Sequence, residues 1–218
     1  RKMKILRVLA LALVLGLAGF VSGCASTEPV AGRDYAPVEP AQPVPGGAQI
    51  VVVEFFWYGC PHCSDMHPRL KAWAQRQPAD VTLVYQPVVA RDRWEGGARM
   101  HFTLLALGEQ QRLADALFEA TQLDGLDLND EAAMLGWAER QGLDRQRFSA
   151  AYHSPQVQRQ VAEARSVAER YQLRGVPALV VDGRYLTSNA YTGSADDTLA
   201  MVDRLVQKVR KERGLPGR

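Results

Sequence analysis

Apolar residues near the middle of the chain form long continuous runs rather than an alternating pattern. Residues 49–58, QIVVVEFFWY, are β-branched and aromatic almost throughout, which is typical of a strand buried on both faces of a sheet. Residues 81–90, VTLVYQPVVA, predict a second buried strand. Between them, residues 64–77 have helical periodicity, and we expect Pro68 to kink this helix because proline lacks the N–H that a helix interior needs. The first part of the fold is therefore predicted to be β-α-β.

The pattern changes to helical periodicity from Gly97 to about Leu173. Apolar residues recur there every three or four positions, as expected for helices that bury one side. Asn129 and Asp130 offer a cap for one of these helices, and Ser154–Pro155 is a favourable start for a later one. We interpret the apolar stripes as core rather than as a cofactor site.

Strand-forming residues return at 177–188, PALVVDGRYLTS. Asp182–Gly183 supplies the two-residue turn of a hairpin, since both residue types tolerate positive φ. A last amphipathic helix is predicted to start near Ser194. The complete order, β-α-β, a long helical stretch and then β-β-α, predicts an α/β protein: a thioredoxin-like fold with an inserted helical domain.

The first residues of the chain are typical of an export signal. The apolar run from Val8 to Val21 has 14 residues, which is short of the roughly 20 that span a bilayer. Small residues precede Cys24 in the sequence VSGC, which resembles the bacterial lipobox, where the cysteine is lipidated and begins the mature chain. The alternatives are an uncleaved anchor or an ordinary cleaved signal with a free Cys24. Residues 25–48 are rich in Pro, Gly and Ala and indicate a tether, in which Arg33–Val38 could add an edge strand.

The net charge of the 218-residue chain is +2, and it is concentrated in this leader. Residues 1–23 hold four basic and no acidic side chains, so the remainder has 22 basic and 24 acidic residues, a net charge of −2. A chain so balanced gives no electrostatic reason to expect nucleic acid or an anionic surface as a partner.

The three cysteines indicate redox chemistry. If Cys24 carries lipid, only Cys60 and Cys63 remain, and closing so small a loop contributes little stability. A Cys-x-x-Cys pair that opens a helix after a buried strand is the redox arrangement. The helix N-terminus favours a Cys60 thiolate by about 0.3–2 kcal/mol. One pKa unit corresponds to about 1.4 kcal/mol, so the helix alone does not make a very acidic thiol. His62 can add a hydrogen bond or positive charge, and Pro61 can tune the geometry.

A stabilised thiolate favours the reduced dithiol, so the disulfide form would oxidise other thiols. The stretches FFWYGCPHC and GVPALVVDGRY, with the helical insertion between them, resemble the DsbA family of periplasmic thiol-disulfide oxidoreductases over Arg33 to Arg210. The resemblance implies that Cys60 is the nucleophile that forms the mixed disulfide with substrate and Cys63 the buried resolving partner. Pro177 matches the cis-proline of the family. Val176 matches the oxidase pattern, and its backbone would pair with an extended substrate segment.

Three further residues of the first strand region are candidates for the site. Glu54 is an acid inside an apolar strand, and burying it unpaired is costly. It matches a buried acid of the family that relays protons from the resolving thiol; the alternative is a Glu at a wet end of the sheet. Trp57 and Tyr58 either line an apolar substrate groove or belong to the core.

The lipobox-like leader and the resemblance together imply a monomer on the periplasmic side, tethered to the outer or inner membrane through lipid, that oxidises newly exported, unfolded or reduced proteins without a bound cofactor. The lipid anchor is a departure from many members of the family, which are soluble. A quinone-linked membrane partner of the DsbB type would reoxidise it. The rivals are a disulfide isomerase or reductase of the same fold, and a metal-binding lipoprotein that uses the two cysteines with His62 and His67. Four ligands at defined spacing are not evident for the latter, and His101 and His153 are interpreted as surface or core residues.

The predicted domains follow from these boundaries. They are a lipoprotein signal peptide (1–23), a tether that includes part of an edge strand (24–48), a first thioredoxin-like part with the CPHC motif (49–93), the inserted helical domain (94–174), a second thioredoxin-like part (175–213) and a tail (214–218).

Overall fold

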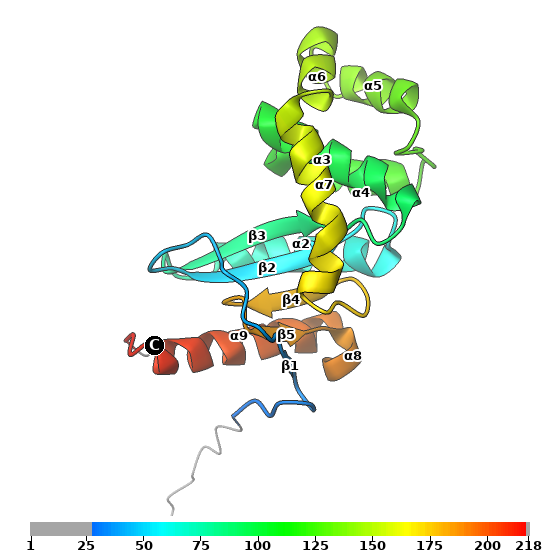
Figure 1. Ribbon diagram of the computed structural model, residues 1–218. Helices are drawn as coiled ribbons and strands as arrows, with labels where there is room; N and C mark the ends of the chain where they lie inside the picture. The colour runs from blue at the N-terminus through cyan, green and yellow to red at the C-terminus, as the bar shows by residue number, and fades with distance from the viewer. Residues whose placement is uncertain (1–27, 217–218) are drawn as a thin grey trace, which may run out of the picture.

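The computed structural model describes residues 28–216, and Figure 1 shows their arrangement. The predicted signal peptide and Cys24 lie outside the described residues. Within residues 28–216, none of the helices combines the length and the apolar character that a membrane span requires.

The described residues form one five-stranded mixed sheet in the order β1-β5-β4-β2-β3. Strand β2 lies parallel to β3 and antiparallel to β4, while β4 and β5 form an antiparallel hairpin and β1 pairs with β5 at the edge. The strands are β1 (Ala36–Pro37), β2 (Ile50–Phe56), β3 (Val81–Pro87), β4 (Ala178–Val181) and β5 (Tyr185–Thr187).

The two apolar runs differ in burial. All seven residues of β2 are buried, as the continuous run predicts. The second predicted strand is present as β3, but the prediction that it is buried is wrong, because β3 is an edge strand and its residues from Thr82 to Gln86 are only partly buried. The apolar side chains of β3 pack on both faces of the sheet, Leu83 and Tyr85 on one face and Val84 on the opposite face. In the loop that follows β3, Val88 and Val89 are buried.

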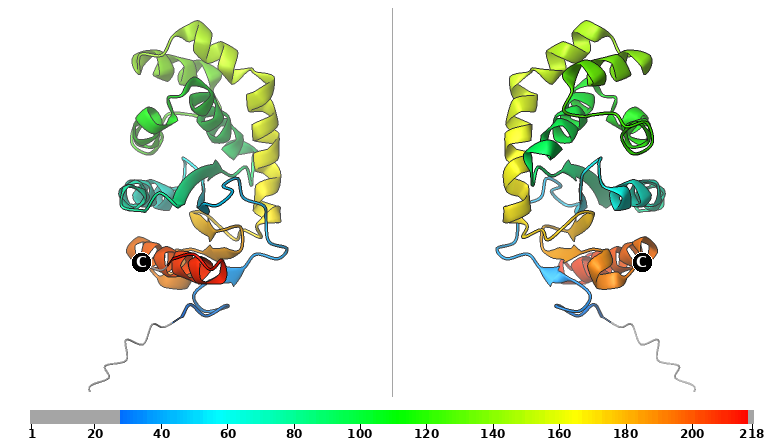
Figure 2. Two further views of the ribbon diagram at one scale, coloured as in Figure 1. Left: turned by 90° about the vertical axis from the view of Figure 1, so that its left-hand side faces the viewer. Right: turned by 90° about the vertical axis from the view of Figure 1, so that its right-hand side faces the viewer.

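Helices cover both faces of the sheet. Figure 2 shows α2 (Pro61–Gln75) and α7 (Pro155–Arg170) on opposite sides, and α9 (Ala195–Glu212) packs against the same face as α2. In Figure 1 the inserted helices stack above the edge of the sheet that β3 forms. They are η1 (Asp92–Trp94), α3 (Glu95–Leu107), α4 (Gln110–Gln122), α5 (Glu131–Arg140) and α6 (Arg145–Tyr152); α8 (Asn189–Thr192) is a short helix after β5.

The predicted helix starts and turn are confirmed by local hydrogen bonds. The side chain of Asp130 accepts from two backbone N–H groups of α5, and Ser154 accepts from the N–H of Val157 at 3.2 Å with proline in the first turn of α7. Ser194 likewise caps α9. The β4–β5 turn has positive φ at Asp182 (57°) and at the glycine that follows (67°), as a two-residue hairpin turn requires.

The insertion shares a hydrophobic core with the end of β2. Phe56, Tyr58 and Cys63 pack in one cluster with apolar residues of α3, α4, α5 and α6. A second cluster lies between the sheet and the helices α2 and α9. The residues around the Cys-x-x-Cys motif are therefore held from two sides, by the sheet and by the inserted helices.

Candidate active site

Cys60 lies at the N-terminus of α2, immediately after the buried strand β2. It is the N-cap residue, with extended backbone (φ −95°, ψ 116°), and Pro61 occupies the first turn, where a missing N–H costs nothing. The Cys60 carbonyl accepts from the N–H of Cys63 at 3.0 Å and of Ser64 at 3.1 Å, so the helix begins at this residue. The prediction that Cys60 lies at a helix N-terminus is confirmed.

The two thiols lie in contrasting environments. Cys63 is fully buried, and burial together with the nearby Cys60 raises its pKa. Cys60 is only partly buried. A hydrogen bond from the Cys63 thiol, against the opposing effect of burial, lowers the pKa of Cys60 to about 6, and the backbone N–H groups of Cys63 and His62 and the charge of His62 add to this. At neutral pH the accessible sulfur is therefore a thiolate and the buried sulfur a thiol.

The loop before β4 lies at the same end of the sheet as Cys60, because β4 runs antiparallel to its neighbour β2. The Val176–Pro177 peptide bond is cis, as the resemblance implies, and the Cys60 Sγ lies 3.5 Å from the Val176 carbonyl oxygen. A second cis bond precedes Pro40, which no sequence signal indicated. In the described residues, no backbone–backbone hydrogen bond uses the N–H or C=O groups of residues 174–176. Within residues 28–216, main chain without backbone–backbone hydrogen bonds thus lies next to Cys60.

Glu54 lies inside the sheet, beneath the two thiols. Its exposed fraction is 0%, and neither carboxyl oxygen has a hydrogen-bond partner. Burial, reinforced by the charge of Cys60, raises its pKa to about 8. The alternative, a Glu54 side chain that reaches solvent at an end of the sheet, is wrong, because its exposed fraction is zero. Glu54 is mostly protonated at neutral pH.

The two aromatic candidates separate in the structure. Tyr58 is 1% exposed and packs against Phe56 and Phe118, so it belongs to the core and not to a substrate groove. Trp57 is partly exposed and stacks on Trp94 of the insertion, with ring centroids 4.6 Å apart. The Trp57 side chain therefore links the active-site loop to the insertion.

The four histidines do not converge. His62 is exposed beside Cys60, while the Nε2 of buried His67 lies 3.1 Å from a carboxylate oxygen of Asp115. His101 is buried in the core, and His153 contacts Glu131 at the surface. In the part of the chain that the structure describes, no three His, Cys, Asp or Glu side chains are grouped so that they could hold a metal ion.

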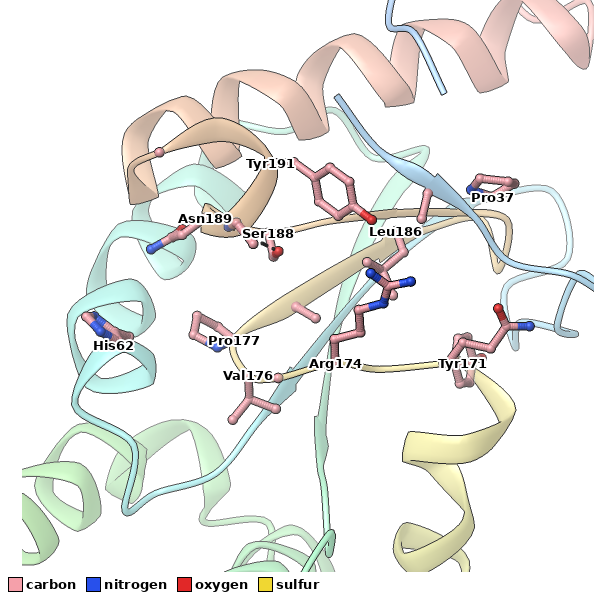
Figure 3. Close-up of a pocket in the computed structure, with 16 residues that line it drawn as sticks. Pro37, His62, Tyr171, Arg174, Val176, Pro177, Leu186, Ser188, Asn189 and Tyr191 are labelled. Atoms are coloured by element: carbon pink, nitrogen blue, oxygen red, sulfur yellow. Dashed lines mark hydrogen bonds between the residues drawn. The ribbon is translucent and has the colours of Figure 1, made fainter. Parts of the chain in front are cut away.

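A groove of about 560 Å³ next to the active site was not predicted (Figure 3). It begins at His62 and Pro177, and its lining includes Arg174, Leu186 and Tyr191. These residues come from α2, the loop before β4, β5 and α8, and no local pattern in the sequence indicates that they meet.

Comparisons with known proteins agree with this geometry. A family model described as DSBA-like thioredoxin domain matches residues 88–203. The thiol:disulfide interchange protein DsbA of Burkholderia cepacia is 33% identical over 204 residues, which cover 93% of this chain and 96% of the relative. The protein of the same name from Pseudomonas aeruginosa is 32% identical over 206 residues, covering 94% and 98%.

Solved structures give the same result. The crystal structure of Pseudomonas aeruginosa DsbA has a TM-score of 0.82 at 32% identity and covers 87% of this chain and 98% of that one. Oxidoreductase DsbA from Xylella fastidiosa has a TM-score of 0.78 at 32% identity, covering 84% and 99%. With the thiolate-forming Cys60 and the buried Cys63, these similarities show that the chain belongs to the DSBA-like thioredoxin-domain family and is a thiol:disulfide oxidoreductase.

Proposed function

We propose that the Cys60–Cys63 disulfide oxidises dithiols of newly exported polypeptides. The observation that carries the proposal is the low pKa of Cys60, about 6 against an ordinary 9.0. Three units correspond to about 4 kcal/mol, and because the thiol is partly exposed we take about half of this. A stabilisation of about 2 kcal/mol makes the pair more oxidising by roughly 40 mV.

The reaction proceeds through two exchanges. A substrate thiolate attacks the Cys60 sulfur, the Cys60–Cys63 bond breaks, and Cys63 takes up a proton because its buried thiolate is unfavourable. The second substrate thiolate then attacks the substrate sulfur of the mixed disulfide and releases Cys60 as a thiolate. Two electrons pass from the substrate to the enzyme. Of the two protons that the substrate thiols release, one balances the proton on Cys63.

Glu54 is proposed as the proton donor to Cys63. Glu54 is fully buried in β2, and its raised pKa keeps its carboxyl group protonated at neutral pH. Its charge also raises the pKa of Cys63, so the two groups interact. A carboxyl group with a pKa near the working pH is suited to give and regain a proton.

The loop before the cis-proline is proposed to hold the substrate main chain. In the described residues the N–H and C=O groups of residues 174–176 form no backbone–backbone hydrogen bond, so they are suited to pair with an extended segment. The Val176 carbonyl lies next to Cys60, which supports the proposal that such a segment binds beside the proposed nucleophile. Trp57 is partly exposed, and we propose that its side chain forms part of the surface around the bound segment.

The cellular setting is also a proposal. The leader and the small residues before Cys24 support a lipid-anchored protein in the periplasm, and the family supports a quinone-linked reoxidant of the DsbB type. The domain division at residues 94 and 174 and the monomeric state are proposed with it. Mass spectrometry of protein isolated from membranes should find Cys24 lipidated at the mature N-terminus; an unmodified Cys24 would contradict the anchor.

The direction of the reaction is tested by equilibrating the protein with glutathione buffers of known ratio. We expect a potential clearly less negative than the value of about −270 mV for thioredoxin. A potential as negative as thioredoxin's would make the protein an electron donor and reverse the proposal. In a dithiol oxidation assay, Cys60→Ser should be inactive, and retained activity would remove Cys60 as the nucleophile.

A further inference from the structure

The groove next to the active site carries one strong positive charge and no negative one. It extends from His62 and Pro177 near the thiols to Pro37 of the edge strand β1, as Figure 3 shows. Proline, leucine, valine, alanine and tyrosine side chains form much of its lining. Apart from His62, Arg174 is the one basic residue among the lining residues, and none of them is acidic.

In the described residues, the charge of the Arg174 guanidinium is not paired with an acidic side chain. Within residues 28–216 it forms no salt bridge and no side-chain hydrogen bond, whereas Arg165 contacts Asp92 and Glu95, and Arg213 contacts Asp182. In Figure 3 the Arg174 side chain extends from the loop into the groove, toward Leu186 and Tyr191. An arginine guanidinium held over an apolar surface is well suited to bind a carboxylate.

The position of Arg174 relative to the nucleophile identifies the occupant as the substrate polypeptide. Arg174 is two residues before Val176, whose carbonyl oxygen lies 3.5 Å from the Cys60 sulfur. The backbone between them is unpaired in the described residues, so an extended chain can lie along it. Such a chain advances about 3.3 Å per residue, so a side chain two to four positions from the reacting cysteine reaches Arg174.

We infer that Arg174 makes the enzyme select polypeptides that carry an Asp or Glu two to four residues from the reacting cysteine, on one side of it. The inference rests on the proposed function, because it assumes that an extended substrate lies along this loop. Arg174 is exposed, so the effect is modest. We expect a preference of threefold to fivefold for an acidic over a neutral residue, which equals about 0.6–1 kcal/mol.

Single-cysteine peptides of one neutral sequence test this. Asp, Asn or Lys is placed in turn at each of the five positions on either side of the cysteine. The second-order rate constant for mixed-disulfide formation with the oxidised protein is measured by acid quench and mass spectrometry. With the wild-type protein, Asp should exceed Asn, and Asn should exceed Lys, at positions two to four on one side. Raising the salt to about 0.5 M should reduce the differences.

Three variants assign the effect to the groove. Arg174→Gln should make the Asp and Asn rates equal, and Arg174→Glu should reverse the order so that Lys is preferred. Arg159→Glu makes the same charge change on the exposed side of α7, outside the groove, and should keep the wild-type preference. Thermal unfolding of each variant checks that its fold is intact.

The outcomes separate this inference from the proposed function. If the Asn peptides form no mixed disulfide with the wild-type protein, the proposed function fails. If they react and Asp gives no advantage at any position, the selectivity inference fails alone. It also fails if Asp helps equally at all positions, or if Arg159→Glu has the same effect as Arg174→Glu, because either result would reflect the overall charge of the protein.

Discussion

Replacing Glu54 by glutamine should remove a pH dependence of stability that is built into the sheet. The carboxyl group is fully buried, and its pKa is raised from 4.5 to about 8, first by burial and then by the charge of Cys60. Below pH 4.5 the group is neutral in the folded and the unfolded chain. Above that pH the unfolded chain loses the proton while the folded protein keeps it, so the unfolded state gains stability as the pH rises.

The size of the effect follows from the two pKa values of Glu54. Each pH unit between 4.5 and 8 lowers the free energy of unfolding by about 1.4 kcal/mol. The loss amounts to about 3 kcal/mol at pH 7 and levels off near 5 kcal/mol above pH 8. Cys60 acts in the opposite sense in the reduced protein: its pKa is lowered from 9.0 to about 6, so its contribution to stability rises between these values. The two effects must be separated.

Urea unfolding in a Cys60→Ser background isolates the carboxyl group. The difference in free energy of unfolding between Cys60→Ser/Glu54→Gln and Cys60→Ser alone should be constant below about pH 4.5 and then grow by close to 1.4 kcal/mol per pH unit, with the double variant more stable. Glu119→Gln, the same chemical change on the exposed side of α4, controls for net charge. Parallel curves for the two proteins from pH 4.5 to 8 would refute the argument that Glu54 is buried and protonated.

Three further predictions concern the thiols and the insertion. Thiolate absorbance should titrate with a midpoint of about 6 in the reduced protein. Cys63→Ala should raise the pKa of Cys60, because the hydrogen bond from the Cys63 thiol is the largest cause of its lowering; an unchanged midpoint would contradict this assignment. His62→Ala should raise that pKa by less, since alanine keeps the backbone N–H and only the charge of His62, the smallest of the causes, is lost; a larger rise than in Cys63→Ala would reverse the ranking. Gly96→Ala should lower the free energy of unfolding by about 1–3 kcal/mol, because its Cβ would collide with the backbone before α5, whereas Gly97→Ala has room; equal stability of the two variants would show that the collision does not occur.

The sequence predicts best where one local cause is sufficient. The unbroken apolar run of β2 reflects burial on both faces, and the caps Asp130 and Ser154 act on N–H groups within three residues of themselves. The Cys-x-x-Cys pair is similarly local, because the strand that ends before Cys60 and the helix that begins there are both evident from the pattern. These parts of the fold and of the site could be predicted.

The failed prediction for β3, and the points that the sequence left open or did not indicate, depend on distant parts of the chain. Strand β3 is as apolar as an inner strand, but no further strand pairs with its outer edge, and that depends on the whole topology. Tyr58 is core because α4 places Phe118 against it. Arg174 faces a groove whose other walls come from α2, β5 and α8. Contacts between such separate segments leave no periodic signal in a single sequence.

The shared cluster of Phe56, Tyr58 and Cys63 with the inserted helices has a consequence for any attempt to shorten this protein. Cutting out residues 92–170 would leave a chain with every strand of the sheet but with two large aromatic side chains turned toward water. Exposing the two side chains costs about 3–6 kcal/mol, which is a large part of the roughly 5–15 kcal/mol by which a typical domain is stable. The inserted helices thus support the turn that carries the cysteines. A shortened enzyme without them would need other apolar side chains to cover Phe56, Tyr58 and Cys63.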